Sequence, residues 1–194
     1  MNLPNKLSLI RIILIPFFMF FFMADFISFG KIIALVIFII ASFTDMLDGK
    51  IARKYNLVTN LGKLLDPIAD KLLVISGLLL VVCDFTIPAP YGVIIAIIII
   101  GRELLISAFR QIAAAQNIVM AADKFGKLKT VTQVIALPML FVVSYLSYNV
   151  VINQTVLLVC QIVAWVFIGL ATLFTVLSGI NYLVKNKQVF KGSK

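Results

Sequence analysis

The chain has 194 residues, of which 62% are hydrophobic, and its formal net charge at pH 7 is +9. A chain this apolar cannot hide its hydrophobic side chains in one soluble core, so composition excludes an ordinary water-soluble domain and indicates several membrane spans. The basic residues lie mostly between the apolar runs, which favours cytosolic loops of a membrane protein over nucleic-acid binding.

Six apolar segments follow one another along the chain, and we expect each to form a helix that crosses the membrane. The first contains a phenylalanine-rich run at residues 17–22, which we assign to the lipid-facing surface. Basic residues gather on one side of the membrane, and only Lys31 lies clearly on the other side. We therefore predict an all-α, multi-pass protein of the cell membrane, a single domain over residues 1–194 with both termini in the cytosol. The expected spans are about 7–24, 31–55, 62–82, 91–116, 126–148 and 155–185.

Four of the eight acidic residues lie close together at the end of the second segment and the start of the third. On a helix, Asp45 and Asp48 share one face, and Asp66 and Asp70 share another. A carboxylate in a membrane is costly and usually marks a function, and four together repel one another unless a cation neutralises them. Oxygen-only ligands suit Mg²⁺ or Mn²⁺, whereas the absence of histidine argues against zinc. The pattern predicts a divalent metal site between two helices.

This site is expected to lie in a pocket that opens towards the cytosol. Asp45 precedes the predicted end of its helix, Tyr55, by ten residues, which corresponds to roughly 15 Å of helix. A lipid could then enter from the side and a water-soluble partner from the cytosol.

The motif D-x-x-D-G-x-x-A-R, eight residues, G-x-x-x-D-x-x-x-D resembles that of the CDP-alcohol phosphotransferase family, and every motif position is present. The resemblance implies a homodimeric, six-helix membrane enzyme that transfers a phosphatidyl or similar group from a CDP-linked donor, here CDP-diacylglycerol, to an alcohol and releases CMP. It also implies that Asp70 is the general base on the acceptor hydroxyl. The metal ligands are then Asp45, Asp48, Asp66 and Asp70, and the contacts to the CDP-lipid are Asp48, Gly49, Ala52, Arg53 and Gly62.

Three further stretches, residues 2–11, 101–110 and 126–133, resemble the branch of this family whose acceptor is sn-glycerol 3-phosphate. The phosphate of that acceptor needs cations, and we predict that Arg110 and Lys127 bind it. The final segment adds nothing specific to this assignment. Weaker candidates for the phosphate are Arg102, Lys63 and Lys129.

Other interpretations stay open for these basic residues and for the whole chain. Arg102 beside Glu103 fits a buried ion pair equally well, and the lysines at 124, 127 and 129 fit plain cytosolic anchors. Other acceptors within the family would give cardiolipin, phosphatidylinositol or phosphatidylserine. Outside it, an aspartate-rich prenyltransferase predicts a second acidic cluster, and a cation transporter predicts broken helices or an internal repeat. The sequence has neither feature.

Overall fold

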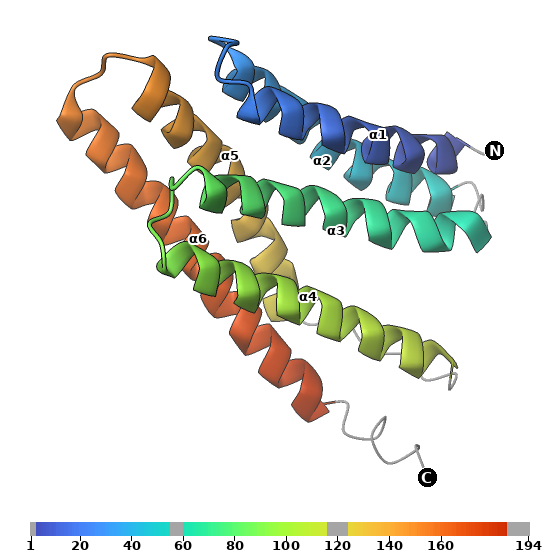
Figure 1. Ribbon diagram of the computed structural model, residues 1–194. Helices are drawn as coiled ribbons and strands as arrows, with labels where there is room; N and C mark the ends of the chain where they lie inside the picture. Colours follow the sequence, from blue (N-terminus) through green and yellow to red (C-terminus); the bar gives the residue numbers. More distant parts are fainter. Residues whose placement is uncertain (1–2, 55–59, 116–123, 186–194) are drawn as a thin grey trace.

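The computed structural model of the protein describes residues 3–54, 60–115 and 124–185, with side chains described for 6–44, 67–113 and 124–185. Over these ranges the chain forms six helices and no strand, which confirms the all-α prediction (Figure 1). Each predicted boundary lies within about one helical turn of the observed one. The helices are α1 (Leu3–Met23), α2 (Gly30–Lys54), α3 (Asn60–Cys83), α4 (Tyr91–Ala115), α5 (Lys124–Asn149) and α6 (Gln154–Lys185).

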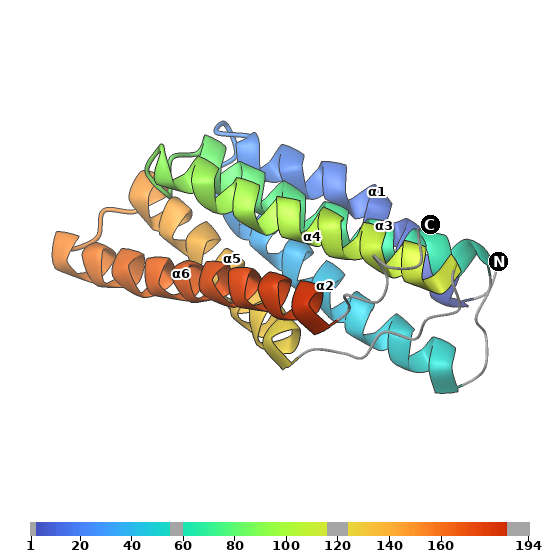
Figure 2. The same cartoon turned by 90° about the horizontal axis from the view of Figure 1, so that it is seen from below.

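The helices run alternately in opposite directions, as short connections between neighbouring helices require. The turns α1–α2, α3–α4 and α5–α6 lie at one end of the bundle, here called the turn end (Figure 1). The start of α1 and the end of α6 point the other way, as do the end of α2 and the start of α3 (Figure 2). We call this second end the motif end, because the acidic motif belongs to it.

The described helices have the apolar surface of a membrane protein. Four of them, α1, α4, α5 and α6, are long and apolar enough to cross a membrane, and the apolar part of α2 (Gly30–Thr44) is shorter. Large hydrophobic side chains stay exposed along most of the bundle, such as Phe43 in α2, Ile97 in α4 and Val166 in α6. Such a surface is stable against lipid and not against water.

The phenylalanine-rich run of α1 divides between the lipid-facing surface and the core. Phe17 and Phe20 are each 54% exposed, but Phe18 and Phe22 are buried, so the assignment of the whole run to lipid is wrong for these two. Consecutive residues of a helix point about 100° apart, so six in a row cannot share one face. The buried stripe of α1 consists of Ser8, Arg11, Ile15, Phe18 and Phe22, at alternating spacings of three and four residues.

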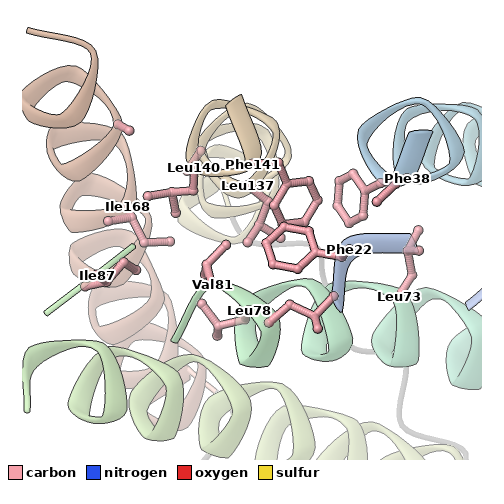
Figure 3. Close-up of a cluster of buried hydrophobic side chains, with 14 of the residues drawn as sticks. Phe22, Phe38, Leu73, Leu78, Val81, Ile87, Leu137, Leu140, Phe141 and Ile168 are labelled. Carbon is pink, nitrogen blue, oxygen red and sulfur yellow. The ribbon is translucent and has the colours of Figure 1, made fainter. Parts of the chain in front are cut away.

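An aromatic cluster forms the centre of the core, where α1, α2, α3 and α5 meet (Figure 3). The ring of Phe141 lies 5.2 Å from the ring of Phe22 and 5.2 Å from that of Phe38, in edge-to-face geometry. Gly77 of α3 lies directly against these rings, because a Cβ atom there would be 3.2 Å from both Phe141 and Phe38. A glycine at this position therefore lets α3 pack closely on the cluster.

At the turn end, Lys31 of α2 lies in a buried polar cluster. Its Nζ donates hydrogen bonds to Asp84 Oδ1 at 2.8 Å and to Ser144 Oγ at 2.7 Å, and it lies 4.1 Å from the ring centroid of Tyr148. The Asp84 carboxylate also accepts a bond from Thr86 Oγ1 at 2.8 Å. The basic residue that departs from the charge pattern of the sequence is thus neutralised within the fold.

Candidate active site

The four predicted metal ligands belong to the motif ends of two helices that follow each other in the chain. Asp45 and Asp48 are residues of α2, and Asp66 and Asp70 are residues of α3. Among the four, Asp70 has a described side chain, and it is exposed. The other predicted motif contacts stay predictions, because Asp45, Asp48, Gly49, Ala52, Arg53, Gly62 and Asp66 lie outside the described side chains.

The Asp70 carboxylate lies within electrostatic range of two lysines. One is its neighbour Lys71, and the other is Lys129 of α5. Lys129 is 3% exposed, and its ammonium group forms an ion pair with Glu103 of α4. A buried ammonium group needs such partners, since an uncompensated charge is costly inside a bundle. The motif end of α3 is therefore linked electrostatically to α4 and α5.

Arg102 connects α4 to α6 beside this ion pair. Its Nη1 lies 4.0 Å from Glu103 Oε2, and its Nη2 donates a hydrogen bond to Ser178 Oγ of α6. A Cβ atom on Gly126 would lie 3.6 Å from Arg102 Nη2, and one on Gly179 would lie 3.5 Å from Arg102 Cγ. Both distances are ordinary van der Waals contacts, so Arg102 packs beside these two glycines of α5 and α6. The ion pair between Arg102 and Glu103, left open by the sequence, is confirmed.

Arg110 lies two turns further along α4, towards the motif end. Its Nε donates a hydrogen bond to Tyr182 Oη of α6 at 3.3 Å, and its Cζ lies 5.8 Å from the centroid of the Tyr182 ring. Tyr182 is buried, whereas Arg110 is exposed. The positive charges of Arg110 and Lys71 are close enough to repel each other. Arg110 therefore lies between α6 and the part of α3 that carries Asp70.

The charged side chains among these form one cluster from the three helices α3, α4 and α5, which we call the charged ring. Among the described residues it combines four cations with two carboxylates, so positive charge is in excess. Such an excess in a largely apolar bundle favours the binding of an anion. The charged ring consists of Lys71, Arg102, Arg110 and Lys129 with Asp70 and Glu103.

The lysines at the start of α5 point in different directions. Lys129 is part of the charged ring, whereas Lys127 is exposed. The two residues differ because positions two apart lie on nearly opposite sides of a helix. Of the two residues predicted to bind the acceptor phosphate, Arg110 belongs to the charged ring and Lys127 does not. Lys129, a weaker candidate in the sequence, is the lysine that the fold brings there.

The residues available for a metal are carboxylates. Among the described side chains, no group of three or more His, Cys, Asp or Glu residues is close enough to hold a metal ion. The Asp70 side chain is an oxygen donor open to solvent, which fits a hard cation, and the three other predicted ligands are also aspartates. The chemistry of the donor set therefore fits Mg²⁺ or Mn²⁺ better than zinc.

Sequence analysis missed the contribution of α6. Ser178 and Tyr182 are buried, and they accept hydrogen bonds from Arg102 and Arg110, respectively. The sequence of this last segment predicts only an apolar span. The available signal is a pair of hydroxyl side chains four residues apart, which places both on one face of the helix. Polar groups on one face of an apolar helix indicate contacts with other helices.

Comparison with known proteins identifies the class to which this fold and site belong. The profile of the CDP-alcohol phosphatidyltransferase family matches residues 1–177, and the chain belongs to that family.

Several relatives carry the same name, CDP-diacylglycerol–glycerol-3-phosphate 3-phosphatidyltransferase. The protein of Bacillus subtilis is 40% identical, with 99% of this chain and 98% of the relative covered. That of Haemophilus influenzae is 39% identical, with 99% and 95% covered, and that of Rickettsia prowazekii is 35% identical, with 97% of each covered. The likeness therefore extends over nearly the whole chain and includes α6.

Proposed function

We propose that this protein is a phosphatidylglycerophosphate synthase, which transfers the phosphatidyl group of CDP-diacylglycerol to sn-glycerol 3-phosphate and releases CMP. The near-full-length likeness to relatives of that name supports the reaction. The structural observation that carries the proposal is the charged ring beside Asp70. An acceptor that is itself a phosphate monoester, with a charge of about −1.5 to −2 at pH 7, suits this excess of cations.

In this proposal the acceptor phosphate binds at Arg110, together with a lysine of α5. The fork of a guanidinium group matches the oxygens of a phosphate, and a lysine adds a point charge. Lys127 is the lysine predicted from the sequence, and Lys129 is favoured by its position in the charged ring. Buried Gln133, one turn after Lys129, adds an Nε2 donor with no hydrogen-bond partner among the described residues.

The reaction replaces the phosphoanhydride bond of the donor by a phosphate ester bond to the acceptor. The acceptor hydroxyl oxygen attacks the phosphorus that carries the diacylglycerol, the bond from that phosphorus to the bridging oxygen breaks, and CMP leaves with the bridging oxygen. Asp70 takes the proton of the attacking hydroxyl, since an exposed carboxylate beside the acceptor site can serve as general base.

The motif helices would bind the nucleotide end of the donor. Asp45, Asp48, Asp66 and Asp70 would hold the divalent cation, which when bound offsets the charge of the pyrophosphate. Gly49 and Ala52 give the cytidine a path along α2, Arg53 contacts its polar edge, and Gly62 leaves clearance at the start of α3.

In the membrane, we propose that all six helices span the bilayer, with both termini and the active site on the cytosolic side of the cell membrane. The common direction of the start of α1 and the end of α6 supports this arrangement (Figure 2). The distribution of lysines and arginines along the sequence supports it as well. The chain would act as a single domain over residues 1–194. Family resemblance further implies a homodimer.

A product assay tests the proposed function. Purified protein, CDP-diacylglycerol and Mg²⁺ are combined with glycerol 3-phosphate, inositol or serine in separate reactions, and CMP release is measured. We expect release with glycerol 3-phosphate. Release with none of the three would reject the synthase, and release with inositol or serine alone would assign the protein to another branch of the family.

A further inference from the structure

Tyr182 links the last helix of the bundle to the proposed acceptor site. We propose that Tyr182 is a positioning residue, whose buried hydroxyl holds the Arg110 guanidinium ready for the acceptor phosphate. This inference rests on the proposed function, because it assigns a role to α6 in the binding of the same phosphate.

The geometry of the pair supports this role. Tyr182 is 2% exposed, so its hydroxyl is held in place by packing, while Arg110 is a long side chain on the exposed part of α4. The hydrogen bond uses Arg110 Nε and does not occupy the two terminal nitrogens of the guanidinium group. Those two nitrogens form the end of the fork that can bind two phosphate oxygens at once.

A fixed Arg110 side chain should bind the acceptor phosphate more tightly than a mobile one, because binding then does not have to order it. A free arginine loses rotamer entropy when it binds a ligand, and a partner that already fixes the side chain reduces that loss. Tyr182 fixes the side chain twice, through the 3.3 Å hydrogen bond and through the contact of Arg110 with the face of its ring.

The same helix holds a second arginine in the same way. Ser178, one turn before Tyr182, is buried and accepts a hydrogen bond from Arg102. Arg102 is paired with Glu103, whereas Arg110 lies within electrostatic range of Lys71, the neighbour of Asp70. Because no carboxylate among the described residues pairs with Arg110, Tyr182 is the hydroxyl whose loss should affect the acceptor.

The test compares Tyr182→Phe with Tyr148→Phe. Both changes remove one tyrosine hydroxyl and one hydrogen bond of 3.3 Å, but Tyr148 lies at the turn end, where it bonds the Asp84 carbonyl. We expect Tyr182→Phe to raise the KM for glycerol 3-phosphate about tenfold. The KM for CDP-diacylglycerol should change by less than about twofold, and Tyr148→Phe should leave both KM values near wild type.

The same change made in an Arg110→Lys variant shows whether Tyr182 acts by positioning Arg110 or by disturbing the fold in general. Arg110→Lys keeps the charge and removes Nε, so adding Tyr182→Phe to it should raise the acceptor KM no further. A further rise there, an equal rise in both KM values, or no effect of Tyr182→Phe alone would overturn the inference. Competition by inorganic phosphate should weaken in parallel with the acceptor KM. Failure of the proposed function looks different, because wild-type protein would then release no CMP with glycerol 3-phosphate.

Discussion

Asp70 is a single exposed carboxylate with two proposed roles, metal ligand and general base, and one substitution separates them. We expect Asp70→Asn to lower turnover about a thousandfold or more, because an amide cannot take the proton of the acceptor hydroxyl. Binding of CDP-diacylglycerol should largely remain. CMP release and equilibrium binding of the donor measure the two effects, with exposed Asp25→Asn as the control. A loss of donor binding as large as the loss of rate would assign Asp70 to metal binding alone.

Lys127 and Lys129 offer a second comparison at the scale of single residues. We expect Lys129→Met to raise the KM for glycerol 3-phosphate about tenfold or more, because Lys129 faces the charged ring and a lost charge-assisted contact has that magnitude. Lys127→Met should change it less, since Lys127 is exposed. Steady-state kinetics with each substrate varied in turn decide between them. A larger increase in KM for Lys127→Met than for Lys129→Met would assign the acceptor phosphate to Lys127, as the sequence predicts.

At the scale of the helices, the polar cluster of the turn end joins α2 to α5 and to the turn between α3 and α4. We expect Lys31→Met to destabilise the protein by about 3 kcal/mol, because it leaves the largely buried Asp84 carboxylate without its cation. Thermal unfolding in detergent measures the loss. The double variant Lys31→Met with Asp84→Asn should recover much of it. Equal unfolding temperatures for wild type and Lys31→Met would show that the pair contributes nothing to stability.

The helices themselves are largely predictable from the sequence, because length and hydropathy decide them locally. What the sequence does not give is the direction of individual side chains. Phe18 and Phe17 are neighbours of one residue type, yet only the first is buried, and the choice depends on where α2 and α5 lie. The acidic motif is recognisable because each of its two pairs of aspartates shares one face of its own helix. The link from Ser178 and Tyr182 to the arginines of α4 joins positions more than seventy residues apart, so the local pattern of two hydroxyls on one face indicates a contact but not its partners.

At the scale of the whole molecule, the proposed metal site has a direct test. We expect removal of divalent cations by a chelator to abolish CMP release, and Mg²⁺ or Mn²⁺ to restore it, because the donor pyrophosphate then lacks its counter-charge. Helix content should stay unchanged, since the described core of the bundle is apolar and needs no metal to fold. CMP assays and circular dichroism on the same sample measure both. Full activity in the presence of the chelator would contradict the proposal.

The buried lysine of the turn end also has a consequence for how the protein is made. In the arrangement proposed above, Lys31 must pass through the bilayer to the far side, and a bare ammonium group resists that transfer. Its partner Asp84 is synthesised 53 residues later, and Ser144 follows 113 residues later. We therefore expect the second helix to reach its final position only after the third has been synthesised, when Asp84 can pair with Lys31.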